Sequence, residues 1–234
     1  MKQRHDNERD HRINKQWLPT TKKEIDHLGW DHIDVIIFSG DAYIDHPSMG
    51  AAVIGRVLEA HGYNVAIVPQ PNWRDDLRDF KKLGRPRLFF GVSAGAMDSM
   101  VNHYTANRRR RSDDAYTPDG RAGQRPDCPT VVYSEILKRL WPDVPVVAGS
   151  IEASLRRLAH YDYWKDRLVP SILMESPADI MVYGMGEKPM LQIADALNDG
   201  MPIEALLDIP QTMVRRPLDE IPTDGSDVVL HSFE

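Results

Sequence analysis

A short stretch with two carboxylates and a histidine follows the first strongly apolar run of the chain. Asp41, Asp45 and His46 stand within six residues of one another. Carboxylates and imidazoles act as general acids and bases and as metal ligands. The structural alternative is that the carboxylates cap the next helix and position its loop. Both interpretations stay open for Asp41, whereas Ser48 is predicted to be a helix cap.

Small residues end four of the predicted strands, where a ligand would reach the backbone. Glycine lets a ligand approach closely and exposes amide donors at helix N-termini. A tight turn needs glycine whether or not a ligand binds, but four such turns at one edge favour a cleft there. None of the four completes a phosphate loop or a G-x-G-x-x-G motif. The turns contain Ser39-Gly40-Asp41, Gly91-Val92-Ser93-Ala94-Gly95, Gly149-Ser150 and Gly184-Met185-Gly186-Glu187.

Arginines concentrate between residues 102 and 129. The run 108–111 is all arginine, and Arg121, Arg125, Tyr104 and Tyr116 lie near it in the sequence. Arginine with aromatic rings can bind phosphate or RNA. Four aspartates dilute this charge, so the segment is predicted to be an exposed loop or lid, with RNA binding as the less favoured hypothesis.

A polar and aromatic block follows the fourth predicted strand. Glu152 and Arg156 are spaced to pair on a helix surface, which is the favoured interpretation for these two. Tyr161, Tyr163 and Trp164 place three rings within four residues, which suits a packing wall for a ligand or another domain.

Composition restricts the class of protein. The chain has 234 residues, 41% of them hydrophobic, and a net charge of −6, which gives no general attraction to nucleic acid or anionic lipid. It shows no secretory signal and no apolar run long enough to span a bilayer. Cys128 is the only cysteine, so this chain cannot supply a disulfide or a cysteine-ligated cluster. We expect an inert thiol and a cytoplasmic protein.

Alternating elements must position these residues. Short apolar runs predict buried strands, and apolar residues at helical spacing predict helices between them. The strands are expected at 33–38, 64–68, 87–92, 144–148 and 179–183, with a further one starting near 227–230. The helices are expected after Thr20 or Thr21 with a capping box to Glu24, and at 48–61, 73–83, 130–140, 151–158 and 189–197. This order predicts an open, doubly wound α/β domain with a mainly parallel sheet and helices on both faces.

The domain organisation follows from the same pattern. Residues 1–16 are polar and predicted to be a disordered tail. The α/β domain is expected over 17–210, and residues 211–234 are expected to be a linker.

Seven blocks of this sequence resemble the N-terminal region of YgiQ-type radical SAM proteins. They are long and idiosyncratic enough to make chance an implausible explanation. The blocks are 17–24 (WLPTTKKE), 40–48 (GDAYIDHPS), 97–107 (MDSMVNHYTAN), 111–118 (RSDDAYTP), 149–157 (GSIEASLRR), 160–164 (HYDYW) and 182–187 (VYGMGE).

The resemblance implies that a radical SAM barrel follows this domain. More remotely, Pro47-x-x-Gly50 and the Gly-x-Gly-Glu turn at 184–187 resemble cobalamin-binding-like domains, so the expected fold is cobalamin-binding-like or flavodoxin-like. A C-x-x-x-C-x-x-C loop of that barrel would hold a [4Fe–4S] cluster that binds S-adenosylmethionine. One cysteine cannot provide this, so we expect a truncated N-terminal piece that takes up no iron and is catalytically silent alone. No D-x-H-x-x-G motif is present, so His-ligated cobalamin is not expected. Ser150 also departs from the expected paired glycine.

The leading hypothesis is therefore a domain that packs on the barrel in cis and completes its active site, for an unknown substrate. The alternatives are a stand-alone cobalamin-like or nucleotide-binding module and an RNA-binding accessory domain. No membrane partner is expected. The isolated chain is expected to self-associate, less so after Tyr161→Ser and Trp164→Ser. Candidate ligand-facing or barrel-facing residues are Ser39, Gly40, Asp41, Asp45, His46, Gly91, Ser93, Gly95, Gly149, Glu152, Arg156, Tyr161, Tyr163, Gly184, Gly186 and Glu187.

Overall fold

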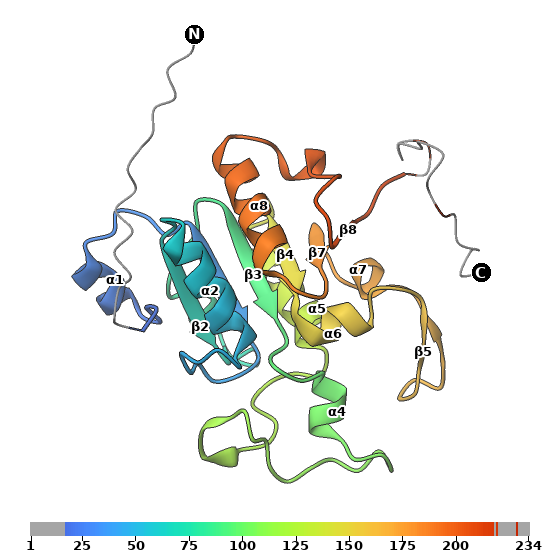
Figure 1. The fold of residues 1–234 in the computed structure, drawn as a ribbon. Helices are drawn as coiled ribbons and strands as arrows, with labels where there is room; N and C mark the ends of the chain where they lie inside the picture. The colour runs from blue at the N-terminus through green and yellow to red at the C-terminus, as the bar shows by residue number, and fades with distance from the viewer. Residues whose placement is uncertain (1–16, 218, 220–227, 229–234) are drawn as a thin grey trace.

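The structure is a computed structural model that describes residues 17–217, 219 and 228. Its centre is a six-stranded sheet (Figure 1). The strands are β1 (Val35–Ser39), β2 (Val65–Pro69), β3 (Phe89–Ser93), β4 (Val146–Gly149), β7 (Ile180–Val182) and β8 (Thr212–Val214).

The strand order, β2-β1-β3-β4-β7-β8, confirms the predicted α/β fold with a mainly parallel sheet. The five strands from β2 to β7 in this order are parallel, and β8 pairs antiparallel with β7. All five predicted buried strands form. The carboxyl ends of β1, β3, β4 and β7 therefore meet at one edge of the sheet.

Helices cover both faces of this sheet, with α2 and α8 in front and α5 behind in Figure 1. The α-helices are α1 (Lys22–Leu28), α2 (Gly50–Ala60), α3 (Arg78–Lys81), α4 (Ser99–His103), α5 (Pro129–Leu140), α6 (Ser150–Leu155), α7 (Ile172–Glu175) and α8 (Glu187–Asn198). Short 3₁₀ turns lie at Pro118–Gly120 and Ile203–Ala205. The predicted capping box of α1 is confirmed, because Thr21 and Glu24 each bond the backbone of the other. Among the described residues, no helix is long and apolar enough to cross a membrane.

Two apolar cores form because successive strand residues point to opposite faces. In β1, Ile36 and Phe38 join the core beneath α5, whereas Val35 and Ile37 join the core beneath α2 and α8. Every residue of β1 is buried. Burial on both faces explains why the strands read as continuous apolar runs.

Two predicted helices are shorter than expected. The helix predicted at 73–83 is restricted to α3, because Asp75 and Asp76 accept hydrogen bonds from the backbone of Leu77 and Arg78. Such local bonds compete with helix formation. The helix predicted at 151–158 ends at Leu155.

The structure also contains a hairpin that the sequence analysis did not predict. It consists of β5 (His160–Asp162) and β6 (Arg167–Val169). The Asp162 carboxylate accepts hydrogen bonds from the backbone of Trp164 and Lys165, and these bonds hold the turn. Three-residue strands are too short to leave a clear alternating pattern in the sequence.

The domain boundaries stay predictions. β8 falls inside the stretch predicted to be a linker, 211–234. The predicted tail at 1–16 lies outside the described residues, and so does the strand predicted near 227–230, apart from Val228.

Candidate functional site

The predicted glycine turns do come together at the carboxyl edge of the sheet. Hydrogen bonds join successive turns: the Gly40 N–H donates to the Ser93 carbonyl at 2.9 Å, and the Ala94 N–H donates to the Ser150 hydroxyl at 3.2 Å. The Gly184 N–H donates to the Ser154 hydroxyl at 3.1 Å. The ends of β1, β3, β4 and β7 thus form one connected surface.

A cleft of about 270 Å³ opens at this edge, between α2 and the ends of β3, β4 and β7. Six of the predicted site residues line it: Gly91, Ser93, Gly149, Gly184, Gly186 and Glu187. A cleft of this size and place fits the general rule that open parallel sheets bind ligands outside the carboxyl ends of their strands.

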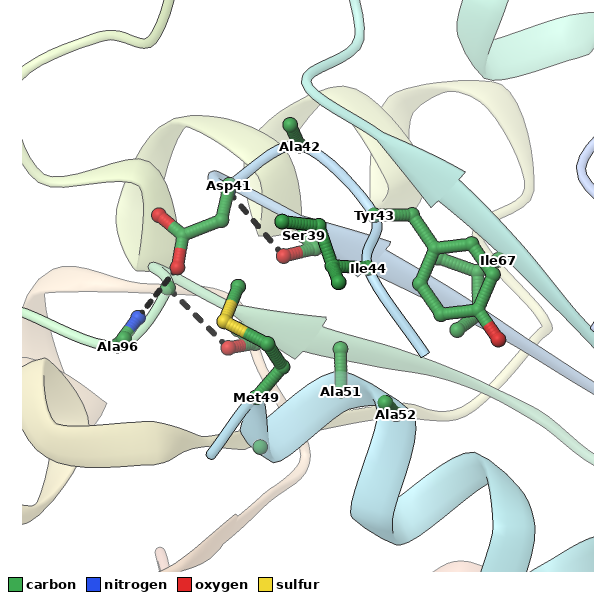
Figure 2. Close-up of a pocket in the computed structure, with 13 residues that line it drawn as sticks. Ser39, Asp41, Ala42, Tyr43, Ile44, Met49, Ala51, Ala52, Ile67 and Ala96 are labelled. Atoms are coloured by element: carbon green, nitrogen blue, oxygen red, sulfur yellow. Dashed lines mark hydrogen bonds between the residues drawn. The ribbon is translucent and has the colours of Figure 1, made fainter. Parts of the chain in front are cut away.

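Asp41 does not face this cleft. It lines a smaller neighbouring cavity with Ser39, Ser93 and Gly95, where its carboxylate accepts a hydrogen bond from the Ala96 N–H at 2.6 Å (Figure 2). Its other oxygen accepts from Arg125 at 2.7 Å. Burial raises the pKa of Asp41, and the Arg125 charge opposes that rise.

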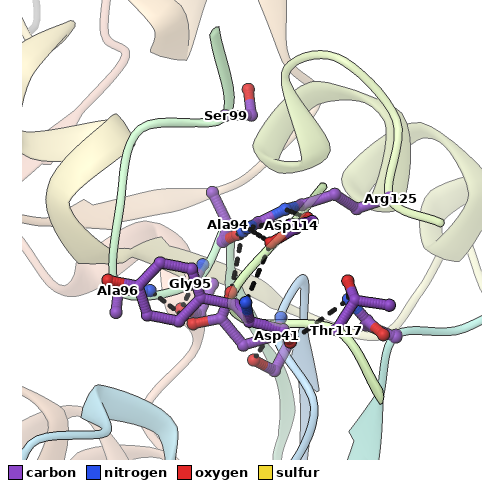
Figure 3. A network of polar contacts seen from close by, with 12 residues as sticks. Asp41, Ala94, Gly95, Ala96, Ser99, Asp114, Thr117 and Arg125 are labelled. Atoms are coloured by element: carbon purple, nitrogen blue, oxygen red, sulfur yellow. Dashed lines mark hydrogen bonds and ion pairs between the residues drawn. The ribbon is translucent and has the colours of Figure 1, made fainter. Parts of the chain in front are cut away.

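Arg125 joins Asp41 to Asp114 in a buried three-residue network (Figure 3). The guanidinium donates to both Asp114 oxygens at 3.1 to 3.2 Å and to the Ala94 carbonyl at 3.0 Å. Burial acts to raise the pKa of Asp114, but the Tyr116 N–H and the Arg125 charge outweigh it and lower that pKa. The network fastens the segment after α4 to the ends of β1 and β3.

Asp41, Asp45 and His46 have separate partners, and this arrangement does not support the hypothesis of one acid/base or metal cluster. Asp45 pairs with Arg56 of α2, and His46 contacts the Ser48 hydroxyl at 2.7 Å. Consistently, no group of three or more potential metal ligands occurs in the described part of the chain. Ser48 is not a cap either, because Met49 precedes α2 and no side chain caps that helix.

Replacing Asp45 tests the contact with Arg56. Hydrogen bonding from Arg56 lowers the pKa of Asp45. When the pKa of a carboxyl is lower in the folded than in the unfolded state, its contacts stabilise the fold at pH values above the unfolded-state pKa. This stabilisation is lost as the pH falls through the folded-state pKa. We expect Asp45→Asn to cost about 1 kcal/mol near pH 7, with the difference from wild type shrinking as the pH falls below the ordinary range of an aspartate. Urea unfolding at several pH values measures this, and a difference that grows toward acid would contradict it.

Glu152 and Arg156 do not form the predicted helix-surface pair. The buried Glu152 carboxylate accepts from the Ser99 hydroxyl at 2.6 Å and from the Thr130 N–H at 3.1 Å. Arg156 instead binds Asp98, at 2.9 Å. These contacts fasten α6 to α4 and to the start of α5, which is a positioning role.

Segment 102–129 is exposed in part only. Residues 106–113 are exposed, as predicted, but Asp114 and Arg125 are buried, so the prediction fails there. Arg125 therefore does not belong to a basic surface patch. The exposed part contacts the aromatic block: the Arg108 guanidinium lies 4.5 Å from the Tyr163 ring centroid.

Cys128 has the inert environment that was predicted. Burial raises the pKa of its thiol to about 12. Because the thiolate is the reactive form, we expect a disulfide reagent at pH 8 to modify it roughly 10³-fold more slowly than a free thiol of pKa near 8.5. Stopped-flow absorbance checks this, with the chain in 6 M guanidinium as the control, where the reaction should become fast. Equal rates in both states would contradict the assignment.

Sequence reasoning missed Asp98, Ser99, Asp114 and the role of Arg125. Their contacts span 11 to 84 positions, so no local spacing reveals them. Ser150 was noted as a departure from glycine, and it does adopt a left-handed backbone with φ 78°. Its hydroxyl accepts the hydrogen bond from Ala94, which offsets part of the strain.

The fold and this edge define a doubly wound α/β domain with a ligand-sized cleft. A family model described as radical SAM N-terminal matches residues 17–234. The chain therefore belongs to the radical SAM N-terminal family.

Curated relatives of this chain carry the name UPF0313 protein. A UPF0313 protein of Porphyromonas gingivalis is 68% identical over 88% of this chain and 32% of its own length. The UPF0313 protein YgiQ of Escherichia coli is 54% identical over 85% of this chain and 27% of its own. The chain thus spans about a third of the length of the curated relatives it matches.

A solved structure with a similar arrangement is the radical S-adenosylmethionine methyltransferase TsrM from Kitasatospora setae, described with cobalamin and a [4Fe–4S] cluster bound. The TM-score is 0.46 and the identity 21%, over 77% of this chain and 26% of that one.

The family name implies an iron–sulfur cluster, and the residues of this chain do not fit one. Cys128 is its single cysteine, whereas cysteine-ligated clusters need several thiolates. Cys128 alone therefore cannot hold a cluster of this kind.

Proposed function

We propose that this chain is the N-terminal domain of a radical SAM, [4Fe–4S]-dependent enzyme and packs on the catalytic region that follows it in longer relatives. The family match and the short share of each relative's length support a partner in cis. In this role the domain completes the active site of the catalytic region, and its substrate is not yet identified.

An exposed apolar surface is the observation that carries the docking proposal. Leu155, Leu158, Tyr161, Leu168 and Met174, here called the apolar face, are between 46% and 64% exposed. Exposed apolar side chains that gather on neighbouring segments mark interaction sites.

The segments that carry the apolar face are adjacent in space. The Ile172 N–H of α7 donates to the Arg156 carbonyl at the end of α6. Lys165 of the hairpin turn pairs with Glu175 of α7 at 2.9 Å. Figure 1 shows α6, α7 and β5 on the same side of the molecule.

Binding to the remainder of a relative tests this proposal. The segment that follows the matched region in the Porphyromonas gingivalis protein would be expressed separately and mixed with this chain. We expect a one-to-one complex by sedimentation velocity, weakened at least about tenfold by Leu155→Ser with Leu168→Ser.

The matched control is Met201→Ser. It removes a similarly exposed apolar side chain that lies just after the C-terminal end of α8 and is not part of the apolar face. It should leave the complex unchanged. The docking proposal would be contradicted if the double substitution in the apolar face left the complex unchanged, or if no complex formed. The chain alone is expected to self-associate through the same face, and the double variant should reduce this.

A second candidate function, a small-molecule binding module, is favoured by the cleft beside α2. RNA binding loses support because Arg125 is buried in a network with two carboxylates.

A further inference from the structure

The cleft between α2 and the strand ends has walls of two kinds. Part of its lining is aliphatic, with Ile54, Val182 and Met190 beside Gly186. Its facing sides carry small residues: Gly50 and Ala51 on α2, opposite Gly91 and Gly149 on the sheet. Because these residues have small or no side chains, they leave space between α2 and the sheet, here called the slot, that can take a flat group.

Glycine keeps this slot open at two positions. A Cβ added at Gly50 would meet no atom within 4 Å, and one added at Gly149 would meet only the Val182 carbonyl oxygen, at 3.7 Å. Gly149 has φ −156°, an extended conformation that any residue adopts. Neither glycine is therefore required by a close contact, and both leave space inside the cleft.

Two helices begin at the cleft without side-chain caps. Helices α2 and α8 both begin there, at Gly50 and Glu187, and neither receives a side-chain cap within the described structure. The first N–H groups of a helix have no partner inside that helix, so they seek acceptors. A ligand in the cleft can supply these acceptors.

The charge of the cleft opposes an anionic ligand. Glu187 is the only ionisable side chain among the described residues that line it. A phosphate there would face a carboxylate and have no lysine or arginine to pair with, which is costly in a partly desolvated site.

Together, these features lead us to propose that the cleft binds an uncharged planar heteroaromatic ring with hydrogen-bond acceptors, such as a nucleobase without phosphate. The ring lies between α2 and the glycine-lined ends of β3 and β4. Its acceptor atoms bond the first N–H groups of α2 and α8. This site is separate from the apolar face, so either proposal can fail without the other.

A pair of fluorescent ligands that differ only by a 5′-phosphate group tests the assignment. 2-Aminopurine riboside is uncharged, and its 5′-monophosphate carries the anion. Fluorescence anisotropy with the purified chain is expected to show binding of the riboside and at least about tenfold weaker binding of the monophosphate. Glu187→Gln removes the negative charge of the cleft, so it should reduce the difference in affinity between the riboside and the monophosphate.

Filling the slot should weaken riboside binding without harming the fold. Gly50→Leu improves the helix propensity of α2, and Gly149→Val suits its extended backbone. Each substitution is expected to lower the affinity for the riboside at least about tenfold. Lys22→Leu, an exposed apolar addition on α1, is the control and should bind like the wild type.

Three outcomes would overturn the proposal. One is no riboside binding up to about 1 mM, the weak end of specific affinity. The second is a monophosphate that binds as tightly as the riboside or more tightly. The third is unchanged riboside affinity in both slot-filling variants, with circular dichroism showing them folded.

Discussion

Replacing Arg125 by methionine is expected to destabilise the domain by about 3 to 5 kcal/mol at neutral pH, the usual result of removing one member of a buried ion network. Methionine fills much of the volume but leaves Asp41 and Asp114 as buried carboxylates without their counter-ion. Urea unfolding followed by circular dichroism measures the loss. We expect it to shrink as the pH falls, because protonation of the two carboxylates removes the uncompensated charge.

Two further variants separate charge from packing. Arg125→Met combined with Asp41→Asn and Asp114→Asn should recover part of the lost stability, because no buried charge then remains. Arg125→Lys should be intermediate, since an ammonium group cannot donate to both carboxylates in the geometry of the guanidinium fork. A loss below about 1 kcal/mol in Arg125→Met would mean that the network is not important for stability.

Adding a single methyl group at Gly40 should be nearly as damaging. A Cβ there would overlap the backbone carbonyl of Ala94, at the point where β1 and β3 end. Because a backbone atom cannot move aside as a side chain can, we expect Gly40→Ala to cost about 3 kcal/mol, the upper range for over-packing. Urea unfolding measures this cost as a lower midpoint concentration, with the dependence of the unfolding free energy on urea unchanged.

Gly50→Ala is the matched control for this prediction. Nothing lies within 4 Å of a Cβ at Gly50, which is the first residue of α2. Alanine is the better helix former, so this variant should be neutral or up to about 1 kcal/mol more stable. Equal effects of the two substitutions would mean that Gly40 is not held against Ala94.

The amino-acid sequence by itself determined the fold class and the edge where a site could lie. The continuous apolar runs of β1 to β4 and β7 are visible without a structure, since both faces of each strand are buried. The glycine turns at their ends follow from the same local rules. The capping box of Thr21 and Glu24 was equally local, and it formed as predicted.

Only the tertiary structure decided which polar residues act together. Arg125 looked like part of a basic surface run, yet it reaches Asp41 across 84 positions. Asp45 and His46 are close to Asp41 in sequence but contact Arg56 and Ser48 instead. Periodicity reports which face of a strand or helix is buried, whereas the pairing of charges depends on how distant loops fold over the sheet edge. That packing gave Asp41, Asp45 and His46 separate partners and built the buried arginine network around Asp41.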